Sequence, residues 1–429
     1  MFQRIILLLA SSLAFLSVSS YGANQSLSPK TYQALSDIQA FLSEEKYSEV
    51  EEGLKDLEEN LNPGFGLALT YQIHAQLFLS QEDSTQALNY FNKALALEAM
   101  KAVQAVSLAT NVAQLHLADG QIEEAIAVLK TRVEAAEEEK AGSTNAMAFI
   151  TLGSAFQLKQ DFNNAIFWLM QGIERAKQPR ENWLQMLMAA HYQLKHYADA
   201  ILVLDQLIVI NEKKEEYWLQ QASLNQMLDK PKEALKVLQL ANIRNILVKE
   251  DGLIILVQLL ITQGAPERAG RILLELLEHE KIDINESNWK LLASAWLQGR
   301  ERTQAINAFI KAAEFSLPQS KDDSETNRSD IKDTEKSRLA SAKLYYRAAQ
   351  LQFDESDFSG AVSSFAKARK LGITGKKVGL SLLMQGNAYF ELKDFVSARV
   401  YFSKALKEPS SSNSAKSWLD YMQQLELFK

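Results

Sequence analysis

Small and apolar residues recur along this chain at fixed distances from one another. Around Ala398, Gly386 and Tyr389 lie upstream, and Phe402 and Ala405 lie downstream. Offsets of three, four and seven residues place side chains on one face of an α-helix. A short polar stretch, LKD, separates the upstream group from the downstream group. The pattern therefore predicts two amphipathic helices joined by a tight turn.

The same arrangement returns along most of the chain. Its copies centre on Val50, Ala87, Ala125, Ala165, Ala200, Ala234, Ala269, Ala305, Ala361 and Ala398. A single helix pair cannot bury the apolar faces that this pattern creates, so successive pairs have to stack on one another. The predicted fold class is all-α: an α-solenoid, a right-handed superhelix of about ten antiparallel helix pairs.

Small residues occupy the positions where the two helices of a pair come closest. A larger side chain there would push the two backbones apart, since protein interiors are close-packed. The residues predicted to hold the repeats together in this way are Ala87, Ala125, Gly153, Ala165, Ala200, Ala234, Ala269, Ala305, Ala361, Gly386 and Ala398.

These spaced positions resemble the tetratricopeptide-repeat family over residues 31–409, with a period near the roughly 34 residues of that class. Trp218 and Trp289 stand where the class pattern has an early Trp. Three units depart from the pattern, because His116, His191 and Leu260 replace a Tyr. The resemblance implies stacked helix pairs that bind other proteins.

The chain begins with Arg4 and an apolar run over residues 5–16 that only two serines interrupt, followed by small residues. This is the pattern of a secretory signal peptide. Ser20 and Gly22 suit a signal peptidase, so we expect a signal peptide at 1–22. The alternative, a membrane anchor, would need about 20 apolar residues. We expect a soluble periplasmic protein that is not a lipoprotein, since the chain has no Cys, and that has no stable membrane insertion after cleavage.

The interval between the centres Ala305 and Ala361 is longer than the period of the repeat, and the extra residues divide the predicted repeats. Units one to eight occupy 31–316, a polar insertion 317–338, units nine and ten 339–409, and a capping helix 413–428. The insertion has almost no apolar residues, so we expect a mobile loop. In architecture, the insertion is either a hinge between the two groups of repeats or a surface excursion from one solenoid. In function, it is either a tolerated insertion or a binding motif.

The sequence provides little for catalysis. With no Cys, thiolate chemistry and Cys-ligated zinc are excluded. His116 and His191 occupy an aromatic position of the repeat, and His191 and His196, five residues apart, do not share one face of a helix. The chain has no nucleotide-binding or hydrolase motif in a useful context. We therefore predict no enzyme, no cofactor, and no catalytic, cofactor-binding or metal-binding residue. A net charge of -7 argues against nucleic acid as a partner.

Uncharged polar residues recur on the first helix of each pair, eleven residues before each centre. This ladder comprises Gln39, Gln76, Gln114, Ser154, Ala189, Ser223, Gln258, Ser294, Gln350 and Asn387, in which Ala189 is the apolar exception. Amides both donate and accept hydrogen bonds, which suits the backbone of an extended segment. The predicted partner-binding residues, on a concave face, are Gln72, Gln76, Gln114, Ser154, Gln157, Gln185, Tyr192, Ser223, Gln226 and Gln258.

Several longer segments carry a closer resemblance. The signal peptide, the opening LSPKTYQALSDIQAFLSEEKYSEVEEGLKDL, the segment QPRENWLQMLMAAHYQLKHYADAILVLDQLI and the terminal SWLDYM resemble periplasmic tetratricopeptide-repeat proteins associated with TonB energy-transduction systems of γ-proteobacteria. The resemblance implies an accessory scaffold for TonB-dependent uptake of iron complexes, with periplasmic segments of TonB, ExbB or ExbD as partners. A scaffold for envelope assembly or polysaccharide export is the alternative, and an enzyme is a remote one.

Overall fold

The computed structural model describes residues 27–139, 145–317 and 328–427, and every regular element in these ranges is an α-helix. The 21 helices of the described residues form ten successive pairs and a final single helix. Each predicted centre, from Val50 to Ala398, lies in the second helix of a pair. The prediction of an all-α fold of paired helices is confirmed. The predicted signal peptide at 1–22 and its cleavage site lie outside the described residues.

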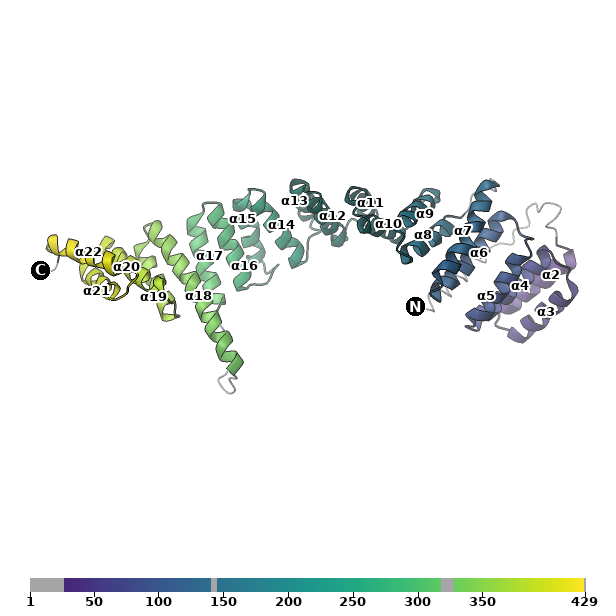
Figure 1. Cartoon of the computed structure of the whole chain (residues 1–429), viewed down its shortest axis with the longest axis horizontal. Helices are drawn as coiled ribbons and strands as arrows, with labels where there is room; N and C mark the ends of the chain where they lie inside the picture. The colour runs from purple at the N-terminus through teal and green to yellow at the C-terminus, as the bar shows by residue number, and fades with distance from the viewer. Residues whose placement is uncertain (1–26, 140–144, 318–327, 428–429) are drawn as a thin grey trace. The chain divides into compact units, whose positions relative to one another are not determined.

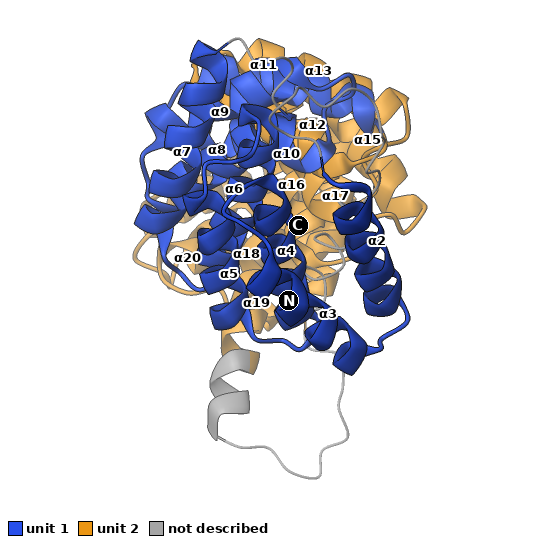
Figure 2. Ribbon diagram, turned by 90° about the vertical axis from the view of Figure 1, so that its right-hand side faces the viewer, with its two compact units in different colours: residues 1–212 blue, residues 213–429 orange. Residues whose placement is uncertain are grey.

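The chain consists of two compact units, residues 1–212 and residues 213–429 (Figure 2). The first unit contains five pairs (Figure 1): α2 (Pro29–Ser43) with α3 (Tyr47–Asn60), α4 (Phe65–Ser80) with α5 (Ser84–Ala96), α6 (Ala102–Ala118) with α7 (Ile122–Glu138), α8 (Ala146–Leu158) with α9 (Phe162–Arg175), and α10 (Glu181–Gln193) with α11 (Tyr197–Ile210).

The second unit contains five more pairs and the final helix. These are α12 (Glu215–Met227) with α13 (Pro231–Ile243), α14 (Glu250–Thr262) with α15 (Pro266–Glu278), α16 (Glu286–Gln298) with α17 (Arg302–Phe315), α18 (Arg328–Asp354) with α19 (Phe358–Lys370), α20 (Lys376–Glu391) with α21 (Phe395–Ala405), and α22 (Ser412–Gln424). No helix in the described ranges is both long and apolar enough to cross a membrane.

One type of turn joins the two helices of every pair. In the turn between α4 and α5, the N–H of Asp83 donates to the carbonyl of Phe78 at 2.9 Å, and Glu82 between them has φ 64°. The backbone bond satisfies a carbonyl that the helix end would otherwise leave unpaired. The left-handed residues of the ten turns are Glu45, Glu82, Gly120, Gln160, Lys195, Asp229, Gly264, Arg300, Ser356 and Lys393.

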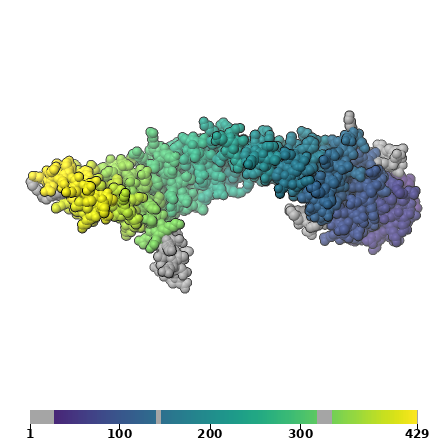
Figure 3. All heavy atoms as spheres, in the orientation of Figure 1, coloured from purple at the N-terminus to yellow at the C-terminus, as the bar shows by residue number. Residues whose placement is uncertain are grey.

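Helices of a pair approach most closely at small residues. All the alanines predicted to hold the repeats together have no exposed surface. A Cβ added to Gly386 would lie 2.6 Å from Cδ1 of Phe402, so the aromatic ring already occupies that space. Buried side chains from α4 to α10 form one hydrophobic cluster, and the atoms of these helices lie closely together on the face that Figure 3 shows.

The segment predicted as a polar loop is partly helical. Residues 318–327 lie outside the described residues, but α18 begins at Arg328, so the prediction of a loop is wrong for residues 328–338. A segment with a single apolar residue, Ile331, cannot form a core. It can still extend a helix that is already nucleated further along the chain, because each added residue gains a backbone hydrogen bond.

The helix pairs on either side of the insertion pack directly against each other. Ser341 in α18 donates through Oγ to the carbonyl of Ala313 in α17 at 2.7 Å, and both residues are fully buried. Arg302 in α17 also forms an ion pair at 2.8 Å with Glu355, the residue that follows α18. The repeats before and after the insertion therefore belong to one compact unit.

The final helix covers the last pair. Met422 in α22 is fully buried against Ala398 and Phe402, and Trp418 stacks on Phe402 with ring centroids 5.4 Å apart. This is the arrangement expected of a capping helix, since a terminal pair would otherwise expose its apolar face. Leu427 packs there as well.

Candidate interaction surface

Several first helices of successive pairs contact one another within each unit. In the first unit α2 contacts α4, α6 contacts α8, and α8 contacts α10; in the second, α18 contacts α20. The ladder residues lie on the first helices, so within each unit the polar side chains of neighbouring repeats lie on the side that the first helices form. We call this side the first-helix face.

The predicted partner-binding residues fall into two sets, one in each unit. None of the ten is fully buried: Gln72, Gln76, Gln114, Ser154, Gln157 and Gln185 are half-buried, and Tyr192, Ser223, Gln226 and Gln258 are exposed. The first seven in chain order belong to the first unit and the last three to the second. Their role in binding stays a prediction.

Two ladder amides have an acceptor atom without a hydrogen bond. Oε1 of Gln76 in α4 and Oδ1 of Asn387 in α20 are buried, and neither has a partner in the described part of the chain. Nε2 of Gln114 donates to Oγ1 of Thr151 at 3.4 Å, a long bond between α6 and α8. Buried polar atoms in folded proteins usually have a partner. The ladder therefore has spare hydrogen-bonding capacity.

A cluster of aromatic and charged side chains surrounds His74, and the sequence interpretation missed it. His74 packs its ring against those of Phe78 and Tyr90, with centroids 5.2 and 4.0 Å away, and its Nδ1 lies 2.5 Å from Oε1 of Glu58. Nζ of Lys93 stands 4.1 Å from the centre of the Tyr90 ring. Burial raises the pKa of the Tyr90 phenol. Spacing could not reveal the cluster, because α3, α4 and α5 all contribute to it.

The last repeat contains a comparable cluster. Tyr389 and Tyr401 stack with ring centroids 5.2 Å apart, and the guanidinium of Arg369 donates to Oγ of Ser381 at 3.1 Å and to Oε1 of Gln385. Burial lowers the pKa of Arg369. The half-buried Arg369 against the Tyr401 ring is suited to contact with acidic or carbonyl-rich groups.

A pocket of about 400 Å³ lies in the second unit between α15, α16 and α17. Its walls include Leu274, Trp289, Trp296 and Lys311. Nε1 of Trp289 is buried and has no hydrogen-bond partner among the described residues. Pockets of this size accept small ligands or one large side chain of a partner.

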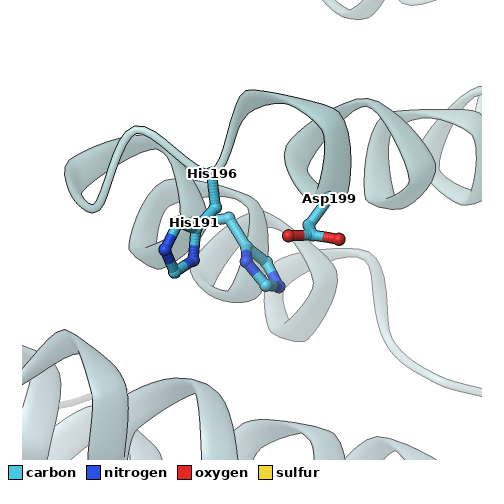
Figure 4. Close-up of side chains that lie close together, drawn as sticks. All are labelled: His191, His196 and Asp199. Atoms are coloured by element: carbon cyan, nitrogen blue, oxygen red, sulfur yellow. The ribbon is translucent and has the colours of Figure 1, made fainter.

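Three potential metal ligands come together in the last pair of the first unit (Figure 4). His191 lies in α10, His196 precedes α11, and Asp199 lies in the first turn of α11. One ligand atom from each residue lies within 4.8 Å of the other two. The sequence interpretation set these histidines aside because residues five apart do not share a face of one helix. In the structure a turn separates them, and that argument does not apply.

With this geometry in place, comparison with known proteins identifies the repeats. The model of the tetratricopeptide-repeat family matches residues 74–139 and 346–414. The fold is a tetratricopeptide-repeat α-solenoid. The tetratricopeptide pairs outside the matched segments have the same turn and the same buried small residues.

Solved structures that resemble this solenoid share few residues with it. Naa15/Naa10 bound to HypK-THB has 13% identity and a TM-score of 0.47, over 88% of this chain and 58% of that one. YrrB, described as a TPR protein with an unusual peptide-binding site, has 17% identity and a TM-score of 0.37, over 46% and 93%. A repeat protein from Cytophaga hutchinsonii has 16% identity and a TM-score of 0.38, over 70% and 98%. This chain thus spans 58% of the first of these chains. No curated protein matches its sequence.

Proposed function

We propose that this tetratricopeptide-repeat protein is a non-catalytic scaffold that binds an extended segment of a partner protein along the first-helix face of a unit. The observation that carries the proposal is the spare hydrogen-bonding capacity of the ladder, in which Gln76 and Asn387 have unpartnered amide oxygens. An amide that gives up no internal hydrogen bond when it turns toward a partner gains the full benefit of the new one.

An extended segment suits this face for a physical reason. Its backbone offers donors and acceptors at regular intervals whatever its side chains are, and amide side chains can pair with both. Each net hydrogen bond contributes only about 0.5–1.5 kcal/mol, and the segment loses entropy on binding, so we expect modest affinity.

The partner we propose is a periplasmic segment of TonB, ExbB or ExbD, and the process is TonB-dependent uptake of iron complexes. This assignment is supported by the resemblance of the longer sequence segments to periplasmic repeat proteins of such systems. It requires export, which the predicted signal peptide at 1–22 would provide. N-terminal sequencing of the protein from a periplasmic extract should begin at Ala23 or next to it.

The test combines capture of partners with a charge-changing variant of the face. Gln76, Gln114 and Gln185 are replaced together by Glu, which puts three carboxylates on the first-helix face of α4, α6 and α10. The matched control replaces Gln86, Gln206 and Gln423 by Glu, because these are exposed amides outside the first helices and the net charge changes equally. Circular dichroism should show both variants folded.

We expect wild type and control to capture a TonB, ExbB or ExbD peptide from envelope extracts, and to bind the purified segment equally well. The face variant should bind at least about tenfold more weakly, corresponding to roughly 1.4 kcal/mol. Failure to enrich any of these peptides contradicts the partner. Equal binding by the face variant and the control contradicts the face.

A further inference from the structure

The turn between α10 and α11 holds two histidines against each other. The N–H of His196 donates to the carbonyl of His191 at 2.9 Å, and Lys195 between them has φ 58°. The rings of the two histidines have their centroids 6.0 Å apart. His191 is buried, with 8% of its surface exposed, while His196 is exposed. The backbone bond fixes this arrangement, since every pair in the chain has the same turn.

Equivalent turns show that side chains at these two positions reach hydrogen-bond distance. In the turn between α6 and α7, Nδ1 of His116 lies 2.6 Å from Oε1 of Gln121. In the turn between α18 and α19, Nε2 of Gln352 donates to Oδ2 of Asp357 at 2.9 Å. The repeat geometry therefore brings the side chains at these positions together. The turn at His191 differs because both residues are imidazoles.

The two imidazoles have atoms available for a ligand. Nδ1 of His191 is buried and has no hydrogen-bond partner in the described residues. The N-cap residues of other second helices, among them Asp83, Asp161 and Asp394, accept a hydrogen bond from the helix N-terminus, but His196 makes no such bond. An unpartnered buried nitrogen in a native fold calls for a specific explanation.

Asp199 completes a set of three ligands. It lies three residues after His196 on α11, so both side chains project from the same side of the helix. We infer that His191, His196 and Asp199 bind a divalent transition-metal ion of the zinc class. This inference goes beyond the proposed scaffold function and does not depend on any partner.

The geometry and chemistry of the three residues fit such an ion. Zinc binds imidazole nitrogen and carboxylate oxygen at about 2.0–2.2 Å, which requires ligand atoms about 3.5 Å apart. The present separations, up to 4.8 Å, close by rotation of the exposed His196 and Asp199 side chains toward the fixed His191. The buried Nδ1 of His191, which has no hydrogen-bond partner in the described residues, is available as one of the ligand atoms.

The test uses untagged full-length protein that has been freed of metal with a chelator. Calorimetric titration with zinc chloride should show one saturable site. His196→Gln is the main variant, because it makes this turn resemble the His116–Gln121 turn and should keep the fold. His279→Gln is the matched control, since His279 is an exposed histidine at the end of α15.

We expect His196→Gln and Asp199→Asn each to weaken zinc binding at least about tenfold, while His279→Gln leaves it unchanged. The rise in the thermal unfolding midpoint on addition of zinc should rank the proteins in the same order as their zinc affinities, because a ligand that binds only the folded state raises the midpoint. The inference is overturned if wild type shows no saturable site up to about 1 mM zinc. A dissociation constant of that size corresponds to a binding free energy of roughly 4 kcal/mol. Equal affinities of wild type and His196→Gln would also overturn it.

Discussion

Leu169 in α9 fills the space into which a side chain at Gly153 in α8 would project. A Cβ at Gly153 would lie 2.6 Å from Cγ of Leu169 and 3.1 Å from its backbone nitrogen. Both helices belong to the same pair, and Leu169 is fully buried. The contact explains why the repeat has a glycine at this position, and it gives a direct test of close packing within a pair.

We predict that Gly153→Ala destabilises the protein, although alanine favours a helix over glycine by about 1 kcal/mol. Overpacking against Leu169 costs about 1–3 kcal/mol and should exceed that gain. The measurement is the midpoint of urea unfolding. Gly66→Ala in α4 is the matched control, because its Cβ would meet Leu27 at an ordinary 3.4 Å. A midpoint for Gly153→Ala at or above wild type would contradict the packing argument.

A second prediction concerns the bond that joins α17 and α18. Ser341→Ala removes the hydroxyl that donates to the carbonyl of Ala313 and leaves that buried acceptor without this donor. We expect a loss of about 1–2 kcal/mol in the free energy of unfolding, measured by urea denaturation. Ser417→Ala, which removes an exposed hydroxyl bonded within α22, should change little. Equal effects of the two substitutions would show that the α17–α18 bond has no special role.

The third prediction is a pH dependence at His191. Burial lowers its pKa from 6.5, so the unfolded chain takes up a proton more readily than the folded one. The contribution of neutral His191 to the free energy of unfolding is therefore fully present above the ordinary pKa of histidine, and it falls as the pH drops below that pKa. His191→Phe, which restores the aromatic residue found at Phe78 and Phe156 in other pairs, should lose less stability between pH 7 and pH 5 than wild type.

The measurement is urea unfolding at several pH values in the presence of a chelator, which removes any contribution of bound metal. His279→Gln serves as the control and should follow wild type, because His279 is exposed. Parallel pH profiles for wild type and His191→Phe would show that the protonation of His191 does not affect folding.

The sequence by itself determined the helix pairs and their centres. Residues such as Gly386, Ala398 and Phe402 mark the contact between two helices, and the spacing that reveals them depends only on the period of a helix and on one tight turn. The left-handed residue at each turn varies from Gly120 to Lys195, yet the turn forms in every pair. Packing of the small residues on both sides outweighs the local preference of that single residue.

Only the tertiary structure decided where the pairs join and which polar side chains meet. Composition predicted a loop up to Arg338, but α18 begins at Arg328, because apolar content reports burial and not helix formation. Helical spacing separated His191 from His196, but a residue with positive φ between them reverses the chain and brings both rings to one place. Periodicity along one helix describes side chains on that helix alone. A site built across a turn depends on how the backbone closes that turn.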